Sequence, residues 1–292
     1  MKKEKGKELV AGLFSLLPII LAISIFLLLL AKAFPLLSLK SLPTILFSSA
    51  WQPQKGQFGL WPFILGTIWV TITAFILAAP LSILTAIYIS DYASGRLKKW
   101  LVPVLDLLAG LPSVIYGMWG ILLIVPLVGK YLAPLFGTYS SGYCILTAGI
   151  VLAVMILPTI VNVSVEVLSA VPADLKEAAL ALGATRLEVV RFIVLKKSAP
   201  GVAAACVLGL SRAFGETLAV MMVVGNVPVI PTSLFSPAYP LPALLANNYG
   251  EMLSIPGYEA ALNLAAIVLL FMVIIFSLAA RLYLNSLEQR TD

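Results

Sequence analysis

The sequence predicts an all-α polytopic membrane protein that crosses the bilayer with six helices. Hydrophobic residues make up 61% of the 292 residues and charged residues only 11%, whereas soluble domains are about 45–50% apolar and about 25% charged. No soluble core absorbs such an excess. Six separate stretches instead reach the length of about 20 apolar residues that spans a bilayer. We therefore expect a single transmembrane domain over residues 1–292.

The six expected spans lie at about residues 9–31, 60–90, 101–125, 142–165, 201–224 and 260–280. The first is longer than the apolar core of a signal peptide, which is about 7–15 residues. We expect it to be retained, although Ala31-Lys32-Ala33 has the form of a cleavage site. In the third span Gly110-Leu111-Pro112 interrupts the pattern, and Asp106 lies near one end, where it suits packing or the interface rather than transport.

The connections between the spans differ in composition. Residues 32–60 contain several prolines and suit a loop or a short interfacial helix, with Trp51 and Trp61 at the membrane–water boundary. Residues 226–259 are rich in proline and contain no Lys or Arg, whereas residues 166–200 are strongly charged.

The distribution of positive charge predicts the orientation. Six spans place both termini on one side, together with fourteen of the 19 Lys and Arg residues, at positions 2, 3, 5, 7, 96, 98, 99, 176, 186, 191, 196, 197, 281 and 290. The other side receives four, at positions 32, 40, 55 and 130, and Arg212 lies inside the fifth span. The positive-inside rule then predicts a multi-pass protein of the cytoplasmic membrane with cytoplasmic N- and C-termini.

Composition also excludes several functions. The net charge of +6 comes from short flanks of apolar runs, which indicates a membrane partner and not a nucleic acid. The chain has no histidine, and its two cysteines, Cys144 and Cys206, lie in apolar segments as buried hydrophobes would. It also lacks the G-x-x-x-x-G-K-[ST] phosphate loop. We therefore expect no catalytic residue, metal site or cofactor in this chain, and no ATP hydrolysis by it.

The charged loop, residues 172–200, is expected to form two short helices. Asp174 and Glu177 have capping-box spacing, and the apolar residues that follow them share one face: Leu175, Ala178, Ala179 and Leu182. Gly183 suits a left-handed helix end. Thr185 and Glu188 then form a second capping box. Glu177 and Glu188 therefore suit capping rather than catalysis.

Two interpretations fit this helix–Gly–helix loop. An amphipathic pair can lie flat on the membrane surface. It can also insert into a groove of a soluble partner.

The loop resembles the EAA signature of ATP-binding-cassette (ABC) importer permeases. The family pattern is matched in register by Glu177-Ala178-Ala179, Gly183, Ile193 and Leu195, while Lys196 stands where the pattern has proline. The resemblance implies the ABC type I importer permease fold with a cytoplasmic coupling helix. It also implies docking onto a cytoplasmic ATPase through five residues: Glu177, Ala178, Ala179, Gly183 and Arg186.

Two further segments, residues 111–120 and 211–226, resemble the permeases of phosphate transport systems, and the Gly-Glu-Thr-x-Ala-Val…Gly-Asn form is similar to the C-type subunit. This resemblance covers roughly residues 60–285. It implies a binding-protein-dependent importer in which the chain pairs with a second permease as a heterodimer. The expected further partners are two ATPase subunits that bind ATP-Mg and an extracellular phosphate-binding protein.

Arg212 and Glu216 are four residues apart in an expected span, so we predict an ion pair on one helix face. Charges inside a membrane are costly, at least about 2.5–3.5 kcal/mol, and face protein or water. The pair either only locks helix packing or places Arg212 on an anion path that Glu216 tunes. Ser113, Tyr116 and Thr217 are expected to add neutral donors to that path.

Other functions remain open from the sequence. The substrate is phosphate by resemblance, and molybdate, sulfate or an organic solute is the alternative. A further alternative is an ion-coupled secondary transporter, and the charged loop, residues 172–200, argues against it, because such a transporter docks no ATPase. The last is a non-transporting membrane scaffold, and the intramembrane Arg212 argues against that, because a scaffold needs no charge inside the membrane.

Overall fold

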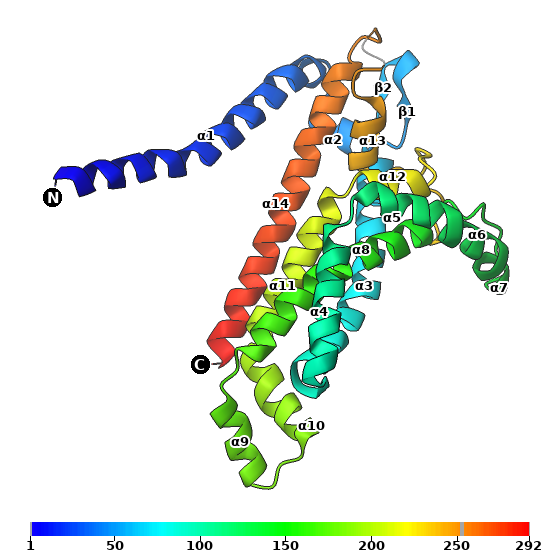
Figure 1. Ribbon diagram of the computed structural model, residues 1–292. Helices are drawn as coiled ribbons and strands as arrows, with labels where there is room; N and C mark the ends of the chain where they lie inside the picture. The colour runs from blue at the N-terminus through cyan, green and yellow to red at the C-terminus, as the bar shows by residue number, and fades with distance from the viewer. Residues whose placement is uncertain (1, 252–253, 292) are drawn as a thin grey trace. The chain divides into compact units, whose positions relative to one another are not determined.

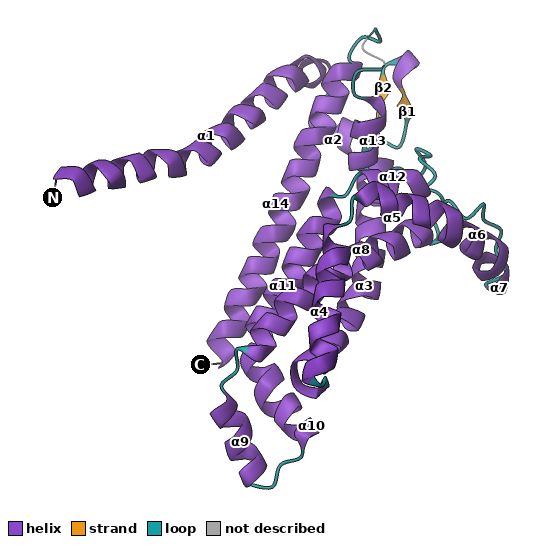
Figure 2. Cartoon of the chain, viewed as in Figure 1, coloured by secondary structure: helices purple, strands orange, loops and turns teal. Residues whose placement is uncertain are grey.

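The computed structural model describes residues 2–251 and 254–291 and divides into two compact units. Unit 1 comprises Met1–Trp61 and Asn247–Phe271, and unit 2 comprises Pro62–Ala246 and Met272–Asp292. Both are predominantly helical, as expected (Figure 2). The last helix, α14 (Tyr258–Thr291), contributes its first part to unit 1 and its remainder to unit 2.

Unit 1 combines helical segments with a small hairpin. Besides the start of α14, its elements are α1 (Lys2–Leu39), α2 (Leu42–Phe47), β1 (Trp51–Gln52), the 3₁₀ turn η1 (Pro53–Lys55) and β2 (Gln57–Phe58). The antiparallel strands pair Trp51 with Phe58, and both rings lie against Tyr258 of α14. The segment expected as a loop or short helix therefore contains α2 and a hairpin.

Unit 2 holds most of the helices (Figure 1). In order they are α3 (Trp61–Ile87), η2 (Tyr88–Tyr92), α4 (Gly95–Gly110), α5 (Ser113–Trp119), η3 (Gly120–Ile124), α6 (Val125–Leu127), η4 (Val128–Leu132), α7 (Ala133–Leu135), α8 (Ile145–Ser169), α9 (Ala173–Ala181), α10 (Arg186–Val189), η5 (Val190–Val194), α11 (Leu195–Gly215), α12 (Leu218–Val223) and α13 (Leu241–Asn248). The segments η2 to η5 are π-helical turns.

Six helices within the described residues are long and apolar enough to cross a membrane, which is the number expected. They are Leu16–Leu39, Trp61–Tyr92, Ser113–Leu135, Ile145–Ser169, Arg186–Gly215 and Tyr258–Leu282. The fourth, α8, is the most buried of them and forms the centre of unit 2 against α4, α11 and α12.

The expected bounds of the third span, 101–125, are wrong. Helix α4 ends at Gly110, and Leu111 is extended at ψ 137° before α5 begins at Ser113. Pro112 disfavours helical geometry at the residue before it. The third spanning helix therefore begins after the break, and Asp106 belongs to a separate helix.

The expected bounds of the fifth span, 201–224, are also wrong. The spanning helix begins at Arg186, passes through η5 and ends at Gly215, where Glu216 is extended at ψ 126°. Lys196 keeps the backbone N–H that proline lacks, and the helix continues past it. The second short helix of the charged loop is therefore the first turn of a spanning helix, and Pro200 lies inside α11.

Two glycines let α11 lie close to α8. A Cβ at Gly201 would overlap Val167, and a Cβ at Gly209 would overlap Ile160. Small residues at such crossings are typical of helix packing in membranes. The approach at Gly209 brings the end of α11 against the part of α8 that contains Thr159.

We predict that Gly209→Ala destabilises unit 2, whereas Gly110→Ala does not. The added methyl at 209 overlaps Ile160, and overpacking costs about 1–3 kcal/mol. At Gly110 no heavy atom lies within 4 Å of an added Cβ. Thermal unfolding midpoints of the purified variants in detergent check this, and equal midpoints for the two variants would contradict it.

Candidate functional site

Arg212 lies in the last turn of α11 and is held by neutral oxygens of two other helices. Its Nη1 donates to Thr159 Oγ1 of α8 at 2.7 Å, and its Nη2 donates to the carbonyl oxygen of Ala109 at 3.3 Å. Ala109 is at the C-terminal end of α4, where carbonyl groups lack helical partners and the helix dipole favours a cation. The side chain is half-buried.

The predicted ion pair between Arg212 and Glu216 is wrong. Because α11 ends at Gly215, the two residues do not share a helix face. Glu216 Oε1 instead accepts the backbone N–H of Ala219 at 3.2 Å, at the start of α12. Within the described residues Arg212 has no ion-pair partner.

Tyr116 joins Arg212 at the same end of α4. Its hydroxyl donates to the carbonyl oxygen of Leu108 at 2.6 Å, one residue before the carbonyl that Arg212 binds. Tyr116 itself is buried in the second turn of α5. The structure therefore brings together two of the predicted path residues, which both follow the Leu111-Pro112 break and bind carbonyl groups that precede it.

The other two predicted path residues lie at helix starts. Ser113 is the first residue of α5 and is half-buried. Thr217 precedes α12, and its Oγ1 donates to the carbonyl oxygen of Gly215 at 3.4 Å. Helices α5 and α12 pack together, because Gly117 lets Ala219 and Met222 approach closely. Each helix break is therefore followed directly by one of two helices, α5 and α12, that pack against each other.

Sequence reasoning missed two residues of α8 at this site. Thr159 accepts from Arg212, and Asn162 Nδ2 donates to Asp106 Oδ1 of α4 at 2.7 Å. Asp106 thus joins α4 to α8 through this hydrogen bond, and its expected role in packing or at the interface stays a prediction. The available signal was the spacing of Thr159 and Asn162, which are polar residues three apart on one face of a predominantly apolar span.

In the docking loop, which is the charged segment of residues 172–200, helix α9 ends just before Gly183, as predicted. Gly183 has φ +90°, and the backbone bonds Gly183 N–H to Leu180 O (3.0 Å) and Ala184 N–H to Ala179 O (3.1 Å) form a Schellman motif. The capping box at Thr185 is also confirmed, with Glu188 bonded to both its backbone N–H and its hydroxyl. The capping box expected at Asp174 is wrong, because Pro172 is the cap residue and has no side-chain donor or acceptor.

The surface of this loop is open. Glu177, Ala178, Gly183 and Arg186 are exposed, whereas Ala179 packs against an apolar cluster that includes Val171, Val189 and Val194. Leu182 beside the glycine is 89% exposed. The inner face of α9 thus fixes its position, and its outer face is available to a partner.

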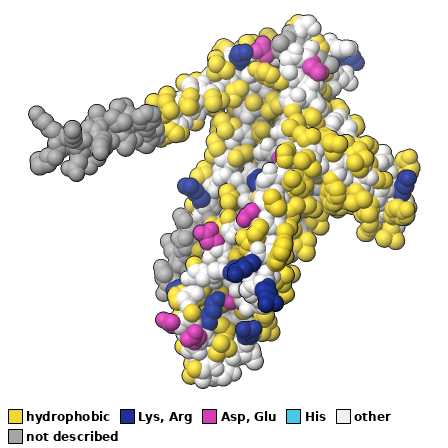
Figure 3. Space-filling model, viewed as in Figure 1, with side chains coloured by type: hydrophobic (Ala, Val, Ile, Leu, Met, Phe, Trp, Pro, Cys, Tyr) yellow, Lys and Arg dark blue, Asp and Glu magenta, His cyan; other side chains and the backbone are white. Residues whose placement is uncertain are grey.

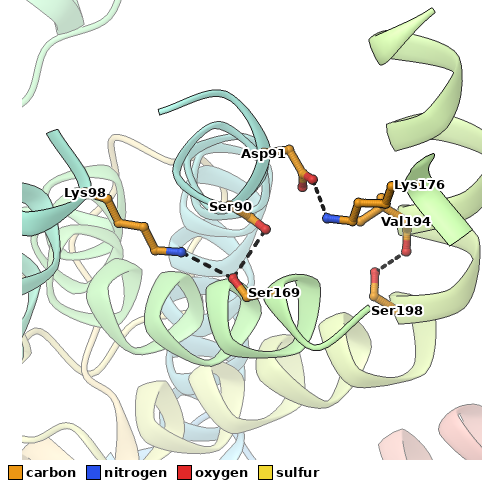
Figure 4. Close-up of polar contacts among 7 residues, drawn as sticks. All are labelled: Ser90, Asp91, Lys98, Ser169, Lys176, Val194 and Ser198. Carbon is orange, nitrogen blue, oxygen red and sulfur yellow. Dashed lines mark hydrogen bonds and ion pairs between the residues drawn. The ribbon is translucent and has the colours of Figure 1, made fainter. Parts of the chain in front are cut away.

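An ion pair connects α9 to η2, the π-helical turn that follows α3. Lys176 Nζ lies 2.6 Å from Asp91 Oδ1, with side chains 23% and 10% exposed (Figure 4). Beside it, Ser169 Oγ of α8 lies 3.4 Å from both Ser90 Oγ and Lys98 Nζ. Asp91 Oδ2 is buried without a hydrogen-bond partner. Within the part of the chain that the structure describes, Lys176 is therefore the one partner of the Asp91 carboxylate.

Among the described residues no three His, Cys, Asp or Glu side chains come close enough to hold a metal ion. The candidate site combines the guanidinium of Arg212 with the hydroxyl groups of Thr159 and Tyr116.

The chain is similar to known membrane permeases. A permease named "Probable ABC transporter permease protein YqgH", from Bacillus subtilis, is 40% identical over 243 residues, which cover 82% of this chain and 77% of the relative. Two similar proteins are named as phosphate transport system permease PstC. The one from Xylella fastidiosa is 37% identical, and the match covers 84% of this chain and 79% of the relative. The one from Methanocaldococcus jannaschii, named as probable, is 35% identical, and the match covers 83% of this chain and 80% of the relative.

A chain of the MetNI methionine ABC transporter in an inward-facing conformation has a similar fold, with a TM-score of 0.55 over 78% of this chain and 94% of that chain at 19% identity. The expected ABC type I importer permease fold is confirmed. Residues 78–292 match the family described as binding-protein-dependent transport system inner membrane component. The chain is therefore a multi-pass membrane permease that belongs to this family.

Proposed function

We propose that the chain is the membrane-spanning subunit of an ATP-driven phosphate importer and forms half of its anion path. The observation that carries this proposal is the intramembrane Arg212, held by neutral oxygens and without a carboxylate partner in the described chain. Similar proteins named as phosphate permeases support the choice of phosphate. Molybdate and sulfate have the same charge type and are the alternative substrates.

Arg212 suits a transported oxyanion. A guanidinium has five N–H donors in a planar fork that matches phosphate oxygens. Two of its nitrogens each donate one bond, to Thr159 and Ala109, so further N–H groups remain for a ligand. The bonds to Thr159 and Ala109 fix the fork, and neutral partners leave its charge intact. Binding by a single arginine is weak enough to allow release.

The two helix breaks support the same path. Non-helical backbone at membrane depth is tolerated where it is buried in protein or lines a water-filled cavity. The breaks at Leu111-Pro112 and Glu216-Thr217 precede α5 and α12, which pack together. We assign Ser113, Tyr116, Thr217 and Glu216 to this path with Arg212, with Glu216 as the residue that caps α12.

The end of unit 2 that contains the start of α4, the docking loop and the start of α11 carries most of its Lys and Arg residues. We propose that this end faces the cytoplasm, together with both termini. Dark-blue Lys and Arg side chains gather there in Figure 3, in the sense of the positive-inside rule. The exposed face of α9, with Glu177, Ala178, Gly183 and Arg186, would dock onto a cytoplasmic ATPase that binds ATP-Mg. This chain would hydrolyse nothing itself.

One continuous helix can transmit movement from the ATPase-docking loop to the anion path. The helix from Arg186 to Gly215 is 30 residues long, which is about 45 Å. It joins the docking loop to Arg212 without a break. Asp91–Lys176 ties α9 to the end of α3, so that displacement of α9 moves two spans together.

The proposed assembly contains a second homologous permease, two ATPase subunits and an extracellular phosphate-binding protein that delivers the anion to the outer loops. Membrane lipid surrounds it, and no nucleic acid takes part. Dependence of uptake on ATP in proteoliposomes separates this proposal from an ion-coupled secondary transporter.

We predict that Arg212→Ala abolishes phosphate uptake, by at least about 100-fold, while the protein still inserts into the membrane. The fold-change corresponds to the loss of about 3 kcal/mol from a charge-assisted contact. Lys130→Ala removes an exposed cation elsewhere and is the control, with uptake unchanged. Uptake of labelled phosphate, molybdate and sulfate by reconstituted complexes is the measurement. Normal phosphate uptake by a well-expressed Arg212→Ala complex would contradict the proposal.

We predict that Gly183→Arg prevents copurification of the ATPase. The residue has φ +90°, where a side chain costs roughly 1–2 kcal/mol, and it lies on the open face of the loop. Gly95→Arg adds the same side chain at a helix start that has open space and no positive φ. Pull-down of the permease should recover the ATPase only with the Gly95 variant, and equal recovery with both contradicts the docking assignment.

We predict that Lys176→Ala lowers the phosphate transported per ATP hydrolysed. It leaves the Asp91 carboxylate without a partner, at a cost of about 1–3 kcal/mol. The Asp91→Lys, Lys176→Asp double variant restores the attraction and should recover most of the coupling. Lys99→Ala, an exposed neighbour, is the control. An unchanged transport ratio in Lys176→Ala contradicts a coupling role for the pair.

A further inference from the structure

A groove of about 700 Å³ runs along the surface of unit 2 between α3, α11 and α14. Every residue that lines it is apolar: Phe75, Ile83, Leu195, Ala199, Val202, Ala203, Cys206, Val207, Leu210, Phe276, Ala279 and Ala280. Its volume lies within the about 300–1,000 Å³ typical of small-molecule sites. No polar side chain is available to orient a polar solute, so only a hydrocarbon ligand suits it.

The groove follows the spanning direction of the helix. From Leu195 to Leu210 it covers about 22 Å of α11 at 1.5 Å per residue, more than half of the ~30 Å hydrocarbon core. The flanking side chains of Leu81, Leu84 and Leu208 are more than half or about half exposed, as in helices that face lipid. An acyl chain of one leaflet therefore has the length and polarity that the groove requires.

Two cations lie at the end of the groove near the docking loop. Lys196 is three, seven and eleven residues before Ala199, Ala203 and Val207, so it lies on the groove side of α11. Arg191 is four residues before Leu195 on the adjoining π-helical turn. Both are exposed, and within the described residues neither has an acidic partner.

We propose that this groove binds an anionic phospholipid, with one acyl chain between α3, α11 and α14 and the headgroup phosphate at Lys196 and Arg191. Clusters of basic residues at the cytoplasmic end of spanning helices attract anionic headgroups. The complementary charge is what selects this lipid over a neutral one. Lys196, which replaces a proline of the importer-permease pattern, thereby acquires a role independent of phosphate transport.

The assembled transporter, purified in detergent, provides the test by native mass spectrometry with added phosphatidylglycerol or phosphatidylcholine of identical acyl chains. The wild type should bind phosphatidylglycerol more tightly. Lys196→Gln should reduce that preference about five-fold, the effect of one cation at the surface. Lys197→Gln is the matched control, because Lys197 is at none of the spacings that share the groove face, and it should leave the preference unchanged.

A second variant tests the acyl-chain half of the site. Ala203→Leu, and more strongly Ala203→Phe, should lower the binding of both lipids by filling the groove, while the complex elutes as the wild type does. Three results would overturn the proposal: equal affinity of the wild type for the two lipids, equal effects of the Lys196 and Lys197 variants, or a helix of the partner permease in the groove of the assembled complex. None of these results bears on phosphate uptake through Arg212.

Discussion

The end of α4 is the point on which the candidate path depends. Arg212 donates to the carbonyl oxygen of Ala109, and Tyr116 donates to that of Leu108, which also accepts the backbone N–H of the cap residue Leu111 at 3.3 Å. Thr159 of α8 holds the second nitrogen of the guanidinium. The break in the chain at Leu111-Pro112 ends the helical bonding of α4, and the guanidinium of Arg212 takes its place at Ala109. One arrangement therefore both stabilises the broken helix and keeps a positive charge at membrane depth.

That arrangement requires α11 to be rigid and close to α8. Gly201 and Gly209 permit the close approach, and the helix is continuous from Arg186 to Gly215. The same helix begins in the docking loop, where Thr185 and Glu188 cap it. Asp91–Lys176 adds a connection to α3. Packing, capping and charge thus link the loop proposed to face a partner to the residue proposed to face the anion.

Sequence reasoning predicted the number of spans, the left-handed Gly183, the capping box at Thr185 and the position of Arg212 within a spanning helix. It failed where local patterns compete with tertiary contacts. A spacing of four residues brings Arg212 and Glu216 together only if both lie in one helix. The helix ends at Gly215 and the backbone of Glu216 is extended, so the pair does not form. Apolar composition alone does not show whether a segment such as 101–125 is interrupted. The acceptors Thr159 and Ala109 are distant in sequence, so only the fold identifies them.

The central claim is that Arg212 carries an accessible charge on the anion path. The most direct measurement is a high-resolution structure of the assembled transporter trapped with phosphate during its cycle. We predict phosphate within hydrogen-bond distance of the Arg212 guanidinium, with Glu216 still bound to the start of α12. Phosphate in the path at a distance from Arg212, or Arg212 paired with a carboxylate and closed off by protein in every state, would contradict it.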